Sequence, residues 1–175
     1  MTEFALETVP TPLGDVMVVR RGAVVVALDW ADCRDRLDGL LARRFGEVSL
    51  VSGPQSEAGQ AVLAYFGGQP TALDGVQVDP GGTEFQAEVW RHLRSIPPGS
   101  SSTYSAIATA LGRPGAERAV GAANGANPIS LILPCHRVIG ADGELRGYAG
   151  GVSRKRWLLR FEGSPVPAEQ ASLFG

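Results

Sequence analysis

The sequence has few residues that could bind a metal or form a disulfide framework. Only two of its 175 residues are cysteine, Cys33 and Cys135, and only two are histidine. The cysteines lie far apart in the chain and form no CxxC pair, which rules out a disulfide framework and argues against a thiolate zinc site. We therefore expect no bound metal. Free thiols fit a reducing compartment.

The sequence also lacks a long apolar run. No stretch approaches the roughly 18–20 apolar residues that span a bilayer. The first residues show no basic segment followed by an apolar one, as a secretory signal would. We expect a cytoplasmic protein without a membrane partner. Hydrophobic residues make up 44% of the chain, so we expect a hydrophobic core within one domain or two small ones.

Lysine and arginine are scarce in the first half relative to acidic residues. Residues 1–80 carry 6 arginines against 11 acidic residues, a net charge of −5. Residues 81–162 carry 10 basic against 6 acidic residues, a net charge of +4. This asymmetry favours an anionic partner such as nucleic acid for the second half alone.

The N-terminal half reads as a small sheet with helices. Residues 3–9 and 16–29 are rich in Val, Leu, Phe and Thr, and the second run is split at Arg21-Gly22, so we expect three strands. Leucines at helical spacing predict a helix over 32–45, and a second helix is expected over 56–66. A short strand at 73–78 would complete a domain spanning residues 1–80.

The second half reads as helical. Thr83 to Gln86 is a capping-box start. Further helices are expected over 104–111, 116–124 and 153–162, with a turn containing Gly112 and Gly115 between the first two. Two short helices around such a turn are typical of a helix-turn-helix, here over 104–125, although plain helical packing gives the same pattern. We predict an α+β protein: a sheet-and-helix domain, an all-helical DNA-binding domain over 81–163, and a tail over 164–175.

The second helix of this predicted helix-turn-helix is built almost entirely from small residues. It suits close approach of its backbone to DNA better than the reading of base edges, and Arg118 is its one long projecting side chain.

A cysteine lies directly beside a histidine in Pro134-Cys135-His136-Arg137. A thiol attacks as its thiolate, and a neighbouring base or cation lowers its pKa from about 8.5. The pair therefore predicts a nucleophile with its activator. A lone cysteine in an apolar run is more often a small buried hydrophobe, so the pair alone leaves both interpretations open.

Four motifs in order resolve this ambiguity. Arg118 to Asn124 (RAVGAAN), Asn127-Pro128, Pro134 to Gly140 (PCHRVIG) and Gly147 to Gly151 (GYAGG) resemble the O(6)-alkylguanine-DNA alkyltransferases. The likeness covers about residues 83–162. It implies that the protein transfers an alkyl group from the 6-oxygen of guanine in DNA to Cys135.

The resemblance also implies roles for three residues around this thiol. His136 would remove the thiol proton through a water, Glu162 would orient the imidazole, and Asn127 would brace the Cys135 segment. Without the family pattern, Glu162 is an ordinary residue at a helix end and Asn127 belongs to an ordinary Asn-Pro turn.

The target base must leave the stack to reach a thiol. By the resemblance, Arg118 would fill the vacated space and Tyr104 would crowd the phosphate, whereas alone they read as a solvated arginine and a capping aromatic. The residues expected to surround the base are Tyr104, Val138, Tyr148, Ala149 and Gly150. Those expected to contact DNA, through the minor groove, are Arg118, Ala119, Ala122, Asn124 and Arg137.

A thioether product would be irreversible, so the resemblance implies a single-turnover protein without a cofactor, monomeric in solution and also active on O(4)-alkylthymine. Two other classes compete with this interpretation. One is an alkyltransferase-like DNA binder, against which Cys135 argues. The other is a helix-turn-helix regulator with a sensing cysteine, for whose effector domain the chain has no room.

The tail carries a second short motif. Gln170 to Phe174 (QASLF) resembles the peptide with which bacterial repair proteins bind the sliding clamp. We hypothesise a weak contact through Gln170, Leu173 and Phe174. Five residues match by chance often, so an idle tail is an equal alternative.

Overall fold

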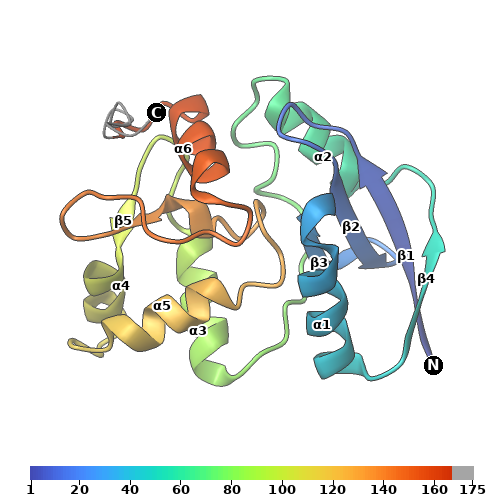
Figure 1. Cartoon of the computed structure of the whole chain (residues 1–175), viewed down its shortest axis with the longest axis horizontal. Helices are drawn as coiled ribbons and strands as arrows, with labels where there is room; N and C mark the ends of the chain where they lie inside the picture. The colour runs from blue at the N-terminus through green and yellow to red at the C-terminus, as the bar shows by residue number, and fades with distance from the viewer. Residues whose placement is uncertain (167–175) are drawn as a thin grey trace, which may run out of the picture.

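The computed structural model describes residues 1–166, and the N-terminal and C-terminal halves of the chain lie side by side (Figure 1). The N-terminal half contains a four-stranded sheet in the order β3-β2-β1-β4. Strands β1 (Thr2–Val9), β2 (Val16–Arg21) and β3 (Val24–Trp30) are antiparallel, and β4 (Val48–Ser52) pairs parallel to β1. The three strands expected from the sequence are confirmed.

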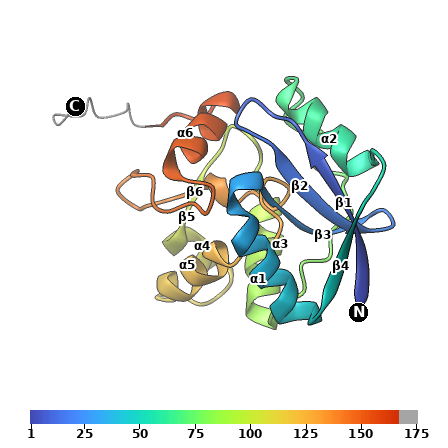
Figure 2. The same cartoon turned by 45° about the vertical axis from the view of Figure 1, so that its right-hand side comes forward.

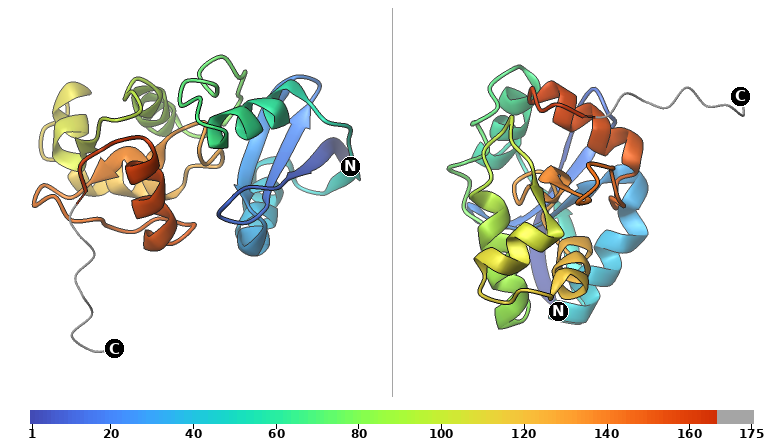
Figure 3. Two further views of the ribbon diagram at one scale, coloured as in Figure 1. Left: turned by 90° about the horizontal axis from the view of Figure 1, so that it is seen from above. Right: turned by 90° about the vertical axis from the view of Figure 1, so that its left-hand side faces the viewer.

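A helix covers each face of this sheet. The 3-10 turn η1 (Ala31–Cys33) leads into α1 (Arg34–Phe45), and α2 (Glu57–Phe66) lies on the opposite side, as the view from above shows (Figure 3). Side chains alternate along β2 accordingly. Met17 and Val19 pack in the cluster that includes Leu37 of α1, whereas Val16 and Val18 pack in the cluster that includes Val62 of α2.

The C-terminal half contains four α-helices within the described residues. These are α3 (Glu84–Arg94), α4 (Tyr104–Ala110), α5 (Glu117–Gly125) and α6 (Val152–Phe161). Helix α3 begins with the expected capping box: Thr83 Oγ1 accepts from the amide of Gln86, and Oε1 of Gln86 accepts from the amide of Thr83. Helices α4 and α5 are joined by residues 111–116, and their use as a helix-turn-helix stays a prediction.

The mixed α+β class is confirmed, but three details of the prediction were wrong. The C-terminal half is not all-helical: β5 (Ser102–Thr103) and β6 (Val138–Ile139) form a small parallel sheet. Residues 73–78 form turns and one isolated bridge at Val78, because Arg94 binds the carbonyls of Leu73, Asp74 and Val76. The fourth strand of the larger sheet is β4, whose short and only partly buried sequence carries little signal.

The two halves share one core. A single cluster of buried residues runs from the α2 face of the sheet into the C-terminal helices. The free edge of β3 is also covered. Leu28 exchanges backbone hydrogen bonds with Pro128 and Ser130, so the sheet holds the segment that precedes Cys135 (Figure 2). The predicted boundary near residue 80 therefore marks a change in sequence pattern, while the segments on its two sides pack together.

The predicted clamp motif at Gln170, Leu173 and Phe174 lies outside the described residues. Within residues 1–166, no helix is long and apolar enough to cross a membrane.

Candidate active site

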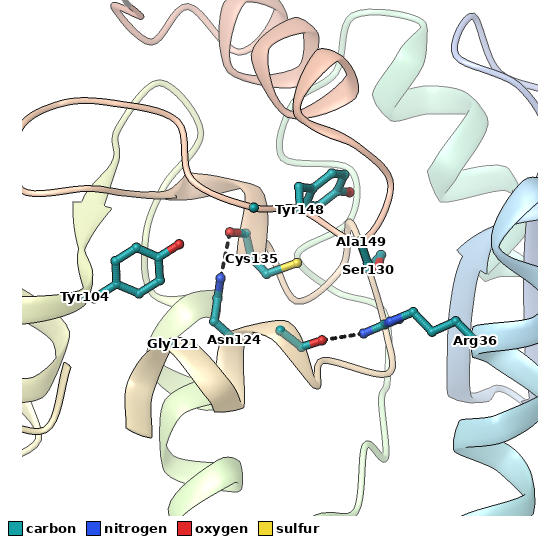
Figure 4. Close-up of a pocket in the computed structure, with 10 residues that line it drawn as sticks. Arg36, Tyr104, Gly121, Asn124, Ser130, Cys135, Tyr148 and Ala149 are labelled. Carbon is teal, nitrogen blue, oxygen red and sulfur yellow. Dashed lines mark hydrogen bonds between the residues drawn. The ribbon is translucent and has the colours of Figure 1, made fainter. Parts of the chain in front are cut away.

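Cys135 lies at a pocket between the two halves of the molecule (Figure 4). Tyr104 of α4 lies on one side of the thiol and Arg36 of α1 reaches in from the other. The backbone of α5 and the loop over 146–151 complete the walls. The lining residues are Arg36, Tyr104, Gly121, Asn124, Gly125, Ser130, Cys135, Gly147, Tyr148 and Ala149.

Two asparagines fix the backbone around the thiol. Asn127 donates from Nδ2 to the carbonyl of Leu133 at 2.7 Å and accepts from the amide of Ile129 at 2.9 Å. Asn124 donates to the carbonyl of Cys135 at 3.4 Å. The intervening Leu131 has a left-handed backbone, φ 69°, a strained conformation for a leucine that its surroundings must maintain. Cys135 then begins the 3-10 turn η2 (Cys135–Arg137).

Burial dominates the ionisation of Cys135. Its residue is 6% exposed, and desolvation raises the pKa of the thiol, while a hydrogen bond from Asn127 and the charges of Lys155 and Arg36 act in the opposite direction. The expectation of a lowered pKa was therefore wrong for the resting protein. A thiol with a raised pKa is protonated at neutral pH. A general base must therefore take its proton before the sulfur can attack.

His136 has the geometry of that base. Its side chain is fully buried, and Nε2 lies 2.8 Å from Oε2 of Glu162. Burial lowers the pKa of His136, and the hydrogen bond and charge of Glu162 oppose this effect. A neutral imidazole that donates from Nε2 to a carboxylate has its lone pair on Nδ1. Within the described residues Nδ1 has no hydrogen-bond partner, so this atom is free to accept a proton.

Glu162 is held by four hydrogen bonds. It accepts from His136, twice from Arg137 at 2.8 Å, and from the hydroxyl of Tyr65 at 2.6 Å. Burial raises the pKa of Glu162, but the bonds and charges of Arg137 and His136 outweigh it and hold the pKa well below its usual range. Glu162 is therefore a carboxylate.

The predicted DNA contact of Arg137 is wrong. This side chain is buried, and its guanidinium binds Glu162 and the carbonyl of Ile96 at 2.7 Å. The buried carboxylate requires a buried counter-charge, and Arg137 supplies it. Asn124 is also buried, at the base of the pocket, where it holds Cys135.

The other predicted DNA contacts have a different environment. Arg118, Ala119 and Ala122 are exposed on α5. Around the pocket, Tyr104 and Tyr148 are half-buried, Ala149 is exposed, and Val138 is buried in β6.

The N-terminal half supports the pocket loop through contacts that sequence reasoning missed. Trp30, at the end of β3, donates from Nε1 to the hydroxyl of Tyr148 at 3.3 Å. Gly150 packs so closely that a Cβ there would lie 2.5 Å from Nε1 of Trp30. Arg154 crosses the same junction, stacking on Trp30 and binding Asp32 and the carbonyl of Leu13. Thus the loop over 146–151 is shaped by residues more than a hundred positions earlier.

Arg36 and Lys155 are two further cations near the thiol. Arg36 binds buried Asp29 at 2.7 Å and the carbonyls of Gly125 and Asn127, which joins α1 to the end of α5. Lys155 is fully buried and donates to the carbonyl of Arg146 at 2.7 Å. Burial lowers the pKa of Lys155 to about 8, opposed by the charge of a Cys135 thiolate. One signal could have found Lys155, since it is the only lysine in the chain.

Comparisons with known proteins agree with this geometry. Residues 84–164 match the family model described as the DNA-binding domain of 6-O-methylguanine DNA methyltransferase. The methylated-DNA–protein-cysteine methyltransferase of Salmonella typhimurium is 48% identical over 93% of this chain and 98% of its own. The protein of that name from Mycobacterium tuberculosis is 53% identical over 67% of this chain and 70% of its own.

Solved structures extend the likeness to the whole fold. The Mycobacterium tuberculosis protein described as OGT in complex with DNA superimposes with a TM-score of 0.76 at 39% identity, covering 94% of this chain and 96% of that one. The O6-methylguanine-DNA methyltransferase of Pyrococcus kodakaraensis gives 0.67 at 27% identity, covering 91% and 99%. With these relatives, and with a buried cysteine beside a histidine–glutamate pair, the chain belongs to the family of methylated-DNA–protein-cysteine methyltransferases.

Proposed function

We propose that Cys135 accepts the alkyl group of O(6)-alkylguanine in DNA, and of O(4)-alkylthymine, by one direct displacement. The sulfur–carbon bond forms as the carbon–oxygen bond breaks, the thiol proton passes to His136, and His136 returns to its neutral form as the released base takes up a proton. The product is a thioether, for which the described residues offer no reversal chemistry, so each chain acts once. The observation that carries the proposal is Cys135 at the pocket, next in the chain to a buried His136 that is hydrogen-bonded to Glu162 and whose Nδ1 has no partner within residues 1–166.

The proton path follows from the ionisation states. Cys135 must lose its proton as it attacks, and His136 takes it on Nδ1 through a water molecule. The resulting imidazolium donates from Nε2 to Glu162, whose negative charge stabilises it. Lys155 and Arg36 favour the thiolate by their positive charge. Charge is thus separated inside the site only during the reaction.

The duplex partner is assigned to the exposed face of α5. Its small residues, including Ala119 and Ala122, permit the helix backbone to approach the minor groove, and Arg118 projects to occupy the space of the flipped base. Tyr104, half-buried at the pocket, adjoins the phosphate of the flipped nucleotide. The carbonyl of Val138 receives the amine of the base, and residues 148–150 wall it.

Intact-mass spectrometry tests the proposal. The protein incubated with duplex DNA containing O(6)-methylguanine should gain one methyl group, about 14 Da, per chain. Cys135→Ala should gain none. Cys33→Ala is the matched control and should gain one, because burial and the charges of Asp29 and Asp32 raise the pKa of Cys33 to about 11. No gain by the unaltered protein would leave it a DNA binder or a regulator and refute the proposal.

A further inference from the structure

The hydroxyl of Tyr65 is a buried group that the proton path above does not use. Tyr65 lies on α2 in the N-terminal half and is fully buried. It donates to Oε2 of Glu162 at 2.6 Å, across 97 positions of sequence. Its ring packs edge-on against Phe66 and Phe161. The N-terminal half thus reaches the carboxylate of the proton relay directly.

Tyr65 is not needed to orient Glu162. Arg137 already binds both carboxylate oxygens, from Nε to Oε1 and from Nη2 to Oε2, and such a two-point bond fixes the plane of the carboxylate. Tyr65 instead shares the one oxygen that faces His136. Burial and the charge of Glu162 raise the pKa of Tyr65 far above its usual range, so the hydroxyl can only donate.

A donor on that oxygen weakens the interaction of Glu162 with an imidazolium. A carboxylate beside a buried histidine ordinarily favours the protonated ring. Each further donor that Oε2 accepts reduces the negative potential that Nε2 of His136 experiences. The ring must be neutral before the reaction if it is to take the thiol proton.

We propose that Tyr65 is a positioning residue that keeps His136 neutral in the resting protein by donating to Oε2 of Glu162. The inference rests on the proposed function, since it concerns the base of that reaction. The charged and titratable groups around His136 come from four segments. They are Cys135 and Arg137 of η2, Lys155 and Glu162 at α6, Tyr148 of the pocket loop and Tyr65 of α2.

Histidine NMR tests the inference without DNA. The chain contains only His92 and His136, so Cε1-labelled histidine gives two signals, which a His92→Gln variant assigns. In Tyr65→Phe, protonation of His136 should begin at a pH higher by about half a unit or more, as loss of a donor to its carboxylate partner requires. The signal of half-exposed His92 should be the same in Tyr65→Phe as in the unaltered protein.

Phe66→Leu is the matched control. It disturbs the aromatic cluster to which Tyr65 belongs, because Phe66 packs against Tyr65, Trp157 and Phe161. It removes no hydrogen bond to Glu162, so the titration of His136 should be unchanged. An identical His136 titration in Tyr65→Phe and the unaltered protein, including no protonation in either before acid unfolding, would overturn the inference. So would an equal shift in Phe66→Leu.

The rate of methyl transfer provides the second measurement. In Tyr65→Phe the fall in rate at acid pH should begin at higher pH, with one methyl group still transferred per chain. If Tyr65 has a role in packing alone, Tyr65→Phe should lower the rate at every pH, and the fall in rate should begin at the same acid pH as in the unaltered protein. That result would contradict the inference. If the unaltered protein transfers no methyl group, the proposed function fails, whereas the NMR titration still decides the role of Tyr65.

Discussion

Replacing Glu162 by Gln should cost a large share of the stability of the fold, although the two side chains have the same shape. Glu162 accepts four hydrogen bonds, three of them at Oε2. A glutamine can keep its oxygen at the Oε2 position, so it loses one bond, the one from Nε of Arg137. It also loses the charge that compensates Arg137, whose side chain is only 6% exposed. Removing one partner of a buried ion pair leaves the other charge uncompensated and costs about 3–5 kcal/mol. Because glutamine retains three of the four hydrogen bonds, we expect a loss of about 3 kcal/mol, at the lower end of this range.

Urea denaturation at pH 7 measures this loss. The control is Asp38→Asn, which removes an ion pair with Arg34 whose side chains are about half exposed, and it should change the free energy of unfolding by less than about 1 kcal/mol. The reasoning would be refuted if Glu162→Gln unfolded within about 1 kcal/mol of the unaltered protein, because the buried pair would then have no net effect.

The pH dependence of this difference has a fixed sign. The folded-state pKa of Glu162 is held below its unfolded value, so the carboxylate contributes its full stability above an unfolded pKa of about 4.3. The contribution is lost as pH falls from there towards the folded pKa. The gap between Glu162→Gln and the unaltered protein should therefore be constant from pH 8 to 5 and narrow below pH 4. A gap that widened with acid would contradict the assignment of a buried carboxylate.

Three further perturbations test other contacts. Gly150→Ala places a Cβ 2.5 Å from Trp30, so it should cost about 1–3 kcal/mol of stability and slow methyl transfer. In Gly147→Ala the new Cβ has no atom within 4 Å, so thermal unfolding should be almost unchanged. Equal effects of the two changes would refute the close-packing argument. Arg36→Ala leaves fully buried Asp29 without its ion-pair partner and should lower the free energy of unfolding, measured in urea, by about 3 kcal/mol. Adding Asp29→Asn to the same chain should restore part of this loss. No restoration would show that the contacts of Arg36 with the carbonyls of Gly125 and Asn127 carry the effect. Thr83→Ala removes the capping box of α3 and should cost about 1 kcal/mol, with Ser101→Ala as an exposed control.

Local signals in the sequence predicted local structure well. The capping box at Thr83 and Gln86 marks the start of α3, and the break at Arg21-Gly22 separates β2 from β3, because both depend on residues within a few positions of each other. The alternation of side chains along β2 likewise follows from strand geometry. Strand β4 was missed because residues 48–52 are short and partly exposed, and pairing with β1 rather than composition defines the strand.

Contacts between distant segments were not predictable from one sequence. Tyr65 meets Glu162 across 97 positions, and Trp30 meets Tyr148 across 118. Neither pair has a local pattern. Arg137 shows how such a contact changes an interpretation. An arginine next to a histidine that is predicted to act as a base, in a basic half of the chain, suggests a DNA contact. The buried carboxylate of Glu162 requires a counter-charge, however, and Arg137 is the group that folding brings to it.

The burial of Cys135 explains why its activation has to be conditional. If each chain reacts once, as proposed, it has no means of recovery when its thiol is consumed by a stray oxidant or electrophile, and both of these reactions depend on thiolate character and exposure. Burial keeps the thiol of Cys135 protonated, and the neutral ring of His136 creates no thiolate by itself. Because the described pocket draws its walls from both halves of the chain, a base that fills it would displace water and strengthen the electrostatic effect of Lys155 and Glu162 on the proton transfer. The same desolvation that makes the resting thiol inert thus makes its deprotonation depend on an occupied pocket.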